Sequence, residues 1–225
     1  MSTPRHSAMI GNMSVLETRK NTWKTISPIL LKRYKRSATF LDYTNTWELL
    51  VAVILSAQMT DEGVNKITPA LFKKYPTPQS LAKADLVSIQ KMVSGVNYFR
   101  AKASYIKRTA QIISNQFNGV VPHTVEELIT LPGVGRKTAV AVLANGFNLF
   151  VGIPVDTHVI RFAKRFKLSR HGDASKIEQD LLEIIPRKHW NAAGYAIKEY
   201  GRKEGRARGY RADNDPLWNA YMNKL

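Results

Sequence analysis

The chain has 225 residues, of which 44% are hydrophobic, so it can form a substantial core and general disorder is excluded. Its 34 lysines and arginines outnumber 17 aspartates and glutamates, and the formal charge of +17 favours a nucleic acid partner over a generally basic or membrane-surface protein. The absence of cysteine excludes disulfides and thiolate metal sites. Without a membrane-length apolar stretch or a signal-peptide core, we expect a soluble, intracellular protein.

Helices are predicted almost throughout the chain. Residues 1–20 are polar and irregular, and we expect a mobile arm there. Residues 47–58 are almost continuously apolar, which predicts a central and mostly buried helix. The helical spacing of apolar residues predicts further helices over 61–75, 81–93, 102–115, 157–166, 176–185 and 190–200. Because no convincing pair of strands is present, the predicted fold class is all-α.

A helical hairpin is predicted around residue 133. Thr124 followed by Glu127 is typical of a capping box, so a short helix begins there. Pro132 and Gly133 end this helix within one or two turns, and a new helix begins near Arg136. The hairpin therefore consists of two helices joined by a glycine-rich turn.

The turn between these helices has the composition of a phosphate-binding site. Gly133 and Gly135, on either side of Val134, let backbone amides approach a ligand closely. The unpaired N–H groups of the next helix point in the same direction, and Arg136 and Lys137 add positive charge. Such a site holds the DNA backbone without reading its sequence. The alternative is an ordinary packing corner between two helices.

Lys137 and Asp156 are the candidate catalytic pair. Each lies at the beginning of a predicted helix. The positive end of a helix and the surrounding cations disfavour the ammonium form of Lys137, and a nucleophilic lysine must be neutral. Asp156 could stabilise a developing sugar cation or transfer a proton, although helix capping alone could explain a carboxylate there. His158, two residues later, is interpreted as a core histidine bonded to backbone, with orientation of Asp156 as the alternative.

Four motifs in this chain resemble those of one protein family. They are LSAQMTD with VNK, YFRAKA, LPGVGRKT and VDTH, at residues 55–61 with 64–66, 98–103, 131–138 and 155–158. Over residues 25–215 the chain resembles the helix–hairpin–helix superfamily of DNA glycosylases, and in particular the endonuclease III family. The resemblance implies two helical domains with DNA crossing the cleft between them. A six-helix barrel that includes the hairpin would cover residues 40–150, and residues 21–39 with 151–225 would form the second domain.

The resemblance also implies a chemistry for the candidate residues. The family flips a damaged base out of the duplex. Lys137 would attack C1′ of the sugar, expel the base and form a Schiff base that breaks the strand by β-elimination, with Asp156 as the catalytic aspartate. Gln58 would fill the gap left by the flipped nucleotide. Tyr98 would be the intercalating wedge, with a buried core tyrosine as the alternative. The remaining expected DNA contacts are Gly133, Val134, Gly135, Arg136, Thr157, Arg206 and Arg208.

The C-terminal segment departs from the family pattern. The four cysteines that hold a 4Fe–4S cluster in endonuclease III relatives correspond here to Gly205, Ala212, Asp215 and Tyr221, so we expect no cluster, no catalytic metal and no other cofactor. The loop over 202–211 stays basic, and we expect it to contact DNA rather than form a frayed tail. In place of a metal cluster, side-chain packing would hold this loop, and the packing residues would be Tyr210, Leu217, Trp218 and Tyr221.

Two smaller departures concern the region of the pocket. Residues 146–154 contain one residue more than is usual, and Asn97 stands where a glycine is common before the wedge. Asparagine is among the better substitutes for glycine in a left-handed turn. Both changes affect the shape of the pocket and leave the catalytic groups in place.

The sequence therefore predicts a bifunctional DNA glycosylase and AP lyase that removes damaged, oxidised pyrimidines. The alternatives are an oxidised-guanine or mainly AP-site-cleaving relative, and a DNA-binding protein without catalysis. We expect a monomer that binds double-stranded DNA carrying a damaged base or abasic site, with no membrane partner, in the cytoplasm or wherever the genome resides. A monovalent cation at the hairpin carbonyls is left open.

Overall fold

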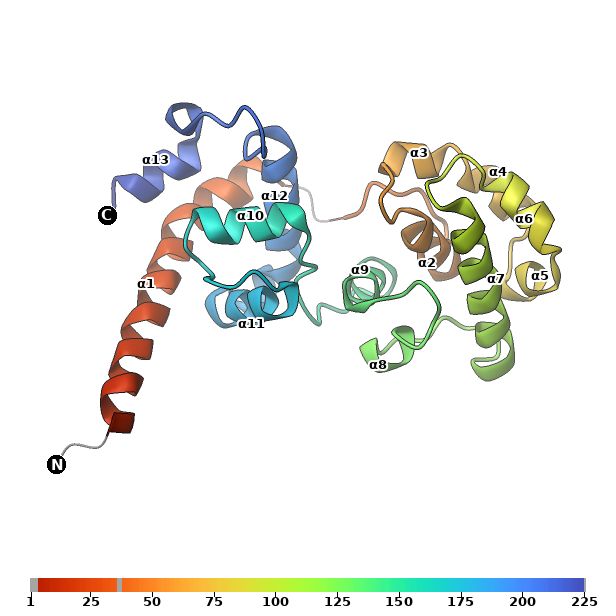
Figure 1. The fold of residues 1–225 in the computed structure, drawn as a ribbon, viewed down its shortest axis with the longest axis horizontal. Helices are drawn as coiled ribbons and strands as arrows, with labels where there is room; N and C mark the ends of the chain where they lie inside the picture. The colour runs from red at the N-terminus through yellow and green to blue at the C-terminus, as the bar shows by residue number, and fades with distance from the viewer. Residues whose placement is uncertain (1–3, 36–37, 225) are drawn as a thin grey trace. The chain divides into compact units, whose positions relative to one another are not determined.

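The computed structural model describes residues 4–35 and 38–224, with side chains described from residue 15 onward (Figure 1). These residues form helices and no strand, which confirms the predicted all-α class. The chain divides into two compact units. Unit 1 comprises Met1–Ser37 and Gly152–Leu225, and unit 2 comprises Ala38–Val151. No helix in the described part of the chain is long and apolar enough to cross a membrane.

Unit 2 is organised around α2 (Thr46–Leu55), as its apolar sequence predicts. Leu49, Leu50, Val51 and Ala52 are completely buried because α2 packs against both α7 and α9. Removing one such leucine from water contributes about 2 kcal/mol to folding. The other helices of the unit are α3 (Asp61–Asn65), α4 (Thr68–Lys74), α5 (Pro78–Lys83), α6 (Leu86–Met92), α7 (Phe99–Gln116), α8 (Val125–Leu128) and α9 (Arg136–Gly146).

Two expected helices of unit 2 are each divided in two. The segment 61–75 forms α3 and α4, with Pro69 in the first turn of α4, where its missing N–H costs no hydrogen bond. The segment 81–93 is interrupted because the Asp85 side chain accepts a hydrogen bond from the Ser88 amide at 2.9 Å and caps α6. A capping side chain starts a new helix wherever it accepts such a bond. Proline in the first segment and aspartate in the second thus mark the beginning of a new helix.

Unit 1 is built on α1 (Pro4–Arg33), whose Trp23, Ile26 and Leu30 lie in its core. The expected irregular backbone over residues 1–20 is therefore wrong from Pro4 onward, whereas the mobility of this arm stays a prediction, and residues 1–3 lie outside the described residues. A tertiary contact holds the helix at Arg19, which forms an ion pair of 3.0 Å with Asp180. The other elements are α10 (Thr157–Arg165), α11 (Ala174–Ile184), η1 (Arg187–His189), α12 (Trp190–Lys203), η2 (Ala212–Asn214) and α13 (Pro216–Met222).

Candidate active site

The predicted helical hairpin is formed by α8, a turn and α9. Thr124 accepts a hydrogen bond from the Glu127 amide at 3.2 Å, as expected for a helix start, and α8 then lasts a single turn. The turn is fixed to the body of unit 2, since the Thr109 hydroxyl donates to the Pro132 carbonyl at 3.2 Å. Val134 is buried with 6% exposure, so of the expected DNA contacts it can offer only its backbone.

The two hairpin glycines serve different purposes. Gly133 has a left-handed φ of +80°, and a Cβ there would lie 3.0 Å from the ring of Tyr105 and 3.2 Å from Ile54. The fold itself therefore requires glycine at 133. Gly135 is extended, with φ −94° and ψ 175°, and a Cβ there would meet nothing within 4 Å. No contact among the described residues therefore requires a glycine at 135. A ligand backbone that approaches the beginning of α9 closely would require one, because a side chain there would obstruct it.

Lys137 lies in the exposed first turn of α9. Gly135 is the N-cap of this helix and supplies no side-chain hydrogen bond, and the first turn contains no acidic residue. Arg136 beside it is exposed as well. The first turn of α9 thus combines a positive helix end with two cationic side chains, which suits the binding of a phosphodiester and brings an amine beside it.

Asp156 is the N-cap of α10 in unit 1. Its Oδ1 accepts hydrogen bonds from the amides of His158 and Val159, at 2.8 and 3.1 Å. The capping role considered from the sequence is therefore real. Capping uses only the oxygen Oδ1 of the carboxylate, and Oδ2 has no hydrogen-bond partner among the described residues. Thr157, the first residue of α10, is exposed.

His158 packs against α12. A Cβ on Gly201 would lie 2.6 Å from its Nδ1, so the contact requires a glycine at 201. Burial lowers the pKa of the His158 imidazole, and the carboxylate of Asp156 opposes this shift. The half-buried side chain is thus held in the packing between α10 and α12, and its Nδ1 lies 3.1 Å from the guanidinium nitrogen Nη2 of Arg161.

Gln58 and Tyr98 are brought together in unit 2. Both have left-handed backbones, with φ of +55° and +57°, and both are exposed. The side-chain amide of Asn97 donates to the backbone carbonyl of Gln58 at 2.6 Å, and this bond joins the two turns. Tyr98 is 67% exposed, which excludes the buried-core alternative. The left-handed residue expected at Asn97 is instead Tyr98, because Asn97 uses its side chain to hold Gln58.

Lys102 supports the same pair of turns and was missed by the sequence interpretation. Its side chain is buried, and its ammonium donates to the carbonyls of Leu55 at 2.7 Å and Ala57 at 2.5 Å. Burial lowers its pKa. The one signal in the sequence is its spacing, since it lies four residues before the buried Ile106 on the apolar face of α7, but spacing alone does not show what the ammonium group would bind.

Asp215 organises the C-terminal loop. This buried carboxylate accepts hydrogen bonds from the hydroxyl of Tyr200 and, at 2.8 Å, from that of Tyr210. It also caps α13 by accepting from the amides of Leu217 and Trp218. Burial is the main cause that raises the pKa of both tyrosines, that of Tyr210 to about 12. The two hydroxyls therefore remain protonated donors across the physiological range.

Arg165 completes the anchoring of this loop. Its guanidinium donates to the Tyr200 hydroxyl at 2.8 Å and lies 3.5 Å from the centre of the Tyr210 ring. The expected packing is present too, since Leu217 and Tyr221 are buried and Trp218 packs against the same core. Both ends of the loop are thus attached to unit 1, while Arg206 and Arg208 between them are exposed.

The residues at the four expected cluster positions do not fit an iron–sulfur cluster. Gly205 and Ala212 have no ligating side chain, and the Asp215 carboxylate is occupied by four hydrogen-bond donors. The Tyr221 ring packs edge-on against Phe166, 5.8 Å between centroids. Within the described ranges, no three His, Asp or Glu side chains gather in a way that could hold a metal ion.

Residues 51–187 match the family model described as HhH-GPD superfamily base excision DNA repair protein. The chain is 43% identical to endonuclease III of Synechocystis sp. over 187 residues, which covers 83% of this chain and 85% of the relative. It is 36% identical to endonuclease III of Bacillus subtilis over 178 residues, covering 79% and 81%. Its structure is similar to that of a trapped endonuclease III–DNA covalent intermediate, with a TM-score of 0.85, 33% identity and coverage of 91% and 98%. A thermostable thymine-DNA glycosylase shares the fold, with a TM-score of 0.72 at 20% identity.

Proposed function

The chain belongs to the endonuclease III family of the HhH-GPD base excision DNA repair superfamily, and we infer that it is a DNA glycosylase with AP lyase activity on damaged pyrimidines. The observation that carries this inference is the exposed Lys137, in the first turn of α9 directly after the glycine turn. A similar protein forms a covalent intermediate with DNA, and an amine is the side chain that bonds to a sugar carbon as a Schiff base.

We propose that the neutral amine of Lys137 attacks C1′ of the damaged nucleotide. The C1′–N bond breaks, and the base leaves with its electron pair and takes up a proton. Opening of the sugar ring gives a Schiff base between Lys137 and C1′. Loss of a proton from C2′ then breaks the C3′–O bond and cleaves the strand. Hydrolysis of the Schiff base restores the free amine.

The carboxylate of Asp156 is proposed to stabilise positive charge on the sugar and to transfer protons. The geometry supports this role, because capping of α10 engages Oδ1 and leaves Oδ2 available to substrate. The rigid attachment of Oδ1 to two amides would orient Oδ2, as preorganised catalysis requires. Lys137 belongs to unit 2 and Asp156 to unit 1.

The proposed partner is double-stranded DNA with a damaged base or an abasic site, bound by a monomer. Gly133 to Arg136 and Thr157 would hold phosphates, and Arg206 and Arg208 would add charge from the C-terminal loop. Gln58 and Tyr98 would enter the duplex as a pair where the damaged base has left it. Their exposure and their left-handed backbones support this role, since strained exposed residues concentrate at functional sites.

We also propose that the chain acts without an iron–sulfur cluster. The hydrogen-bond network around Asp215, together with Arg165, would do the structural work of the metal site in its relatives. The support is chemical, because none of the four side chains at the cluster positions is a thiolate.

Borohydride trapping on a duplex with one abasic site tests the function. We expect a covalent adduct with the wild type and with Lys91→Gln, an exposed lysine on α6, and none with Lys137→Gln. An adduct in Lys137→Gln would refute the nucleophile, and no adduct in the wild type would leave only a DNA-binding protein. A panel of duplexes that each carry one lesion, including oxidised guanine, then defines the substrate.

A further inference from the structure

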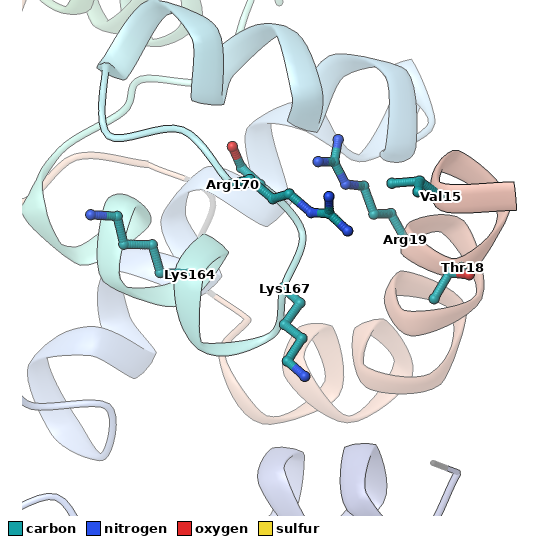
Figure 2. Close-up of a pocket in the computed structure, with 7 residues that line it drawn as sticks. Val15, Thr18, Arg19, Lys164, Lys167 and Arg170 are labelled. Atoms are coloured by element: carbon teal, nitrogen blue, oxygen red, sulfur yellow. The ribbon is translucent and has the colours of Figure 1, made fainter. Parts of the chain in front are cut away.

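A basic cavity lies within unit 1, away from the residues assigned above. Its volume is about 530 Å³, and it lies between α1 and the segment that follows α10 (Figure 2). It is lined by Val15, Thr18, Arg19, Lys164, Lys167, Ser169 and Arg170. Four of these seven residues are cationic and none is acidic, so the cavity has the electrostatic character of an anion-binding site.

Most of this positive charge is not neutralised by the protein. Arg19 forms its ion pair of 3.0 Å with Asp180, which lies outside the lining. Lys164, Lys167 and Arg170 are exposed and have no carboxylate partner among the described residues. Figure 2 shows the side chain of Arg170 extending toward Arg19. Like charges that converge in this way are stabilised by an anion between them.

Lys167 occupies a position where the fold favours glycine. It directly follows the C-cap of α10 with a left-handed φ of +52°, and the next amide, that of Leu168, donates to the Ala163 carbonyl at 2.8 Å. Glycine is the usual residue at this point of a helix end. A lysine can interact with the negative end of the helix, but the last turn already contains the cations Lys164 and Arg165. The strained lysine therefore points to a use for its charge in the cavity.

Ser169 adds a neutral donor to the cavity. Only 3% of Ser169 is exposed. Its Oγ accepts a hydrogen bond from the backbone amide of His171 at 3.1 Å. Because this bond uses only a lone pair, the hydroxyl hydrogen is left for an acceptor on a ligand. A buried hydroxyl donor that lines the same cavity as guanidinium and ammonium groups matches the oxygens of a phosphate group.

We propose that this cavity binds a phosphate group through Arg170, Lys167 and the hydroxyl of Ser169, with Arg19 as a paired guanidinium behind them. The phosphate belongs either to the DNA backbone beyond the damaged nucleotide or to a free polyphosphate compound. Both sources present the same oxygens to the same donors, so the experiment has one arm for each.

The test variant combines Lys167→Gly with Arg170→Gln. Glycine is favoured at a left-handed position and Arg170 is exposed, so the variant keeps its fold, which its thermal melting checks. The matched control combines Lys176→Gln with Lys188→Gln, two exposed cations of unit 1 outside the cavity. Arg170→Gln alone provides a second variant that leaves the turn unchanged.

The first arm measures binding of an undamaged duplex over a range of salt concentrations. For DNA as the source, we expect the slope of log affinity against log salt to fall by about 0.9 in the variant, because one phosphate contact is lost. The second arm titrates inorganic tripolyphosphate by calorimetry. For a free phosphate compound, we expect at least a tenfold loss of affinity in this arm, with unchanged duplex binding.

Control and variant that behave alike in both arms would overturn the proposal. Borohydride trapping at saturating abasic-site DNA is expected to be the same in all of these proteins. Failure of the cavity proposal is therefore distinguishable from failure of the proposed chemistry at Lys137.

Discussion

Lys102 and Ala57 are joined by a hydrogen bond of 2.5 Å from a buried ammonium group to a backbone carbonyl. Ala57 immediately precedes Gln58, and the Gln58 carbonyl is held in turn by Asn97. The residue after Asn97 is Tyr98. The side chains of Asn97 and Lys102 thus fix the backbone at Gln58, beside Tyr98, and these are the two residues proposed to enter the duplex.

Lys102→Met is expected to lower the free energy of unfolding by about 2 kcal/mol, because the buried carbonyl of Leu55 and the partly buried carbonyl of Ala57 lose their donor. It should also weaken the binding of damaged duplexes through the loosened turn at Gln58. Urea denaturation and excision kinetics measure the two effects. Arg108→Met, at an exposed position on the same helix, is the control. Full stability and full excision in Lys102→Met would show that this lysine positions nothing.

The hairpin glycines provide a pair of substitutions that separate folding from DNA binding. Gly133→Ala is expected to destabilise unit 2 by about 1–3 kcal/mol, since alanine is strained at φ +80° and contacts Tyr105 and Ile54. Gly135→Ala should leave the unfolding free energy nearly unchanged, because its methyl group meets no protein atom. The same methyl group should reduce DNA affinity by obstructing the approach of a phosphate. Urea titrations and duplex binding of both variants check this, and normal DNA affinity in Gly135→Ala would contradict the phosphate role of the turn.

The sequence was sufficient to predict this hairpin because its signals are local. Proline and glycine end one helix, and a glycine N-cap begins the next, whatever the rest of the chain does. The division of the segments 61–75 and 81–93 was also locally encoded, but the apolar periodicity continues across the break and hides it. Asp85 shows the reason, since its capping role is apparent only when its side chain is seen to accept the Ser88 amide.

The supporting network of the site could not be predicted in the same way. A lysine such as Lys102 is ordinarily an exposed residue, and its burial depends on carbonyls 45 and 47 residues away in sequence. The sequence correctly indicated that packing would hold the C-terminal loop, yet it gave no sign that Asp215 and Arg165 would meet there. Contacts between distant segments have no local signature in the sequence. These contacts determine which hydrogen-bond partners such polar side chains find.

The exposed arginines of the C-terminal loop are expected to act through charge alone. Replacing Arg206 and Arg208 by alanine should weaken the binding of all DNA sequences about equally and reduce the salt slope by about 1.8, at roughly 0.9 for each phosphate contact. Binding measured at several salt concentrations checks this. Lys176→Gln with Lys188→Gln again serves as the control, and an unchanged slope in the arginine variant would place the loop away from DNA.

Asp215→Ala should be the most destabilising change in the C-terminal loop. It removes the cap of α13 and leaves the buried hydroxyls of Tyr200 and Tyr210 without their acceptor, at a cost of about 3–5 kcal/mol in unfolding free energy. Asp213→Ala, at an exposed neighbour, is the control. On the proposal that hydrogen bonds rather than a metal hold the loop, a chelator should leave the stability of the wild type unchanged. Loss of stability on chelation would refute the proposed absence of a cluster.

His158 should make unit 1 sensitive to mild acid. Its pKa in the folded protein is below the ordinary value of about 6.5 that applies to the unfolded chain, chiefly because of burial. Between these two values the unfolded state binds the proton and the folded state does not, so stability falls as the pH decreases from about 6.5 and stops changing once both states are protonated. His158→Gln removes the titrating group, and its unfolding free energy should depend less on pH in this range. Urea denaturation at several pH values compares the two proteins. Parallel pH profiles would mean that the imidazole titrates alike in both states, and that its contact with Gly201 does not disfavour the charged form.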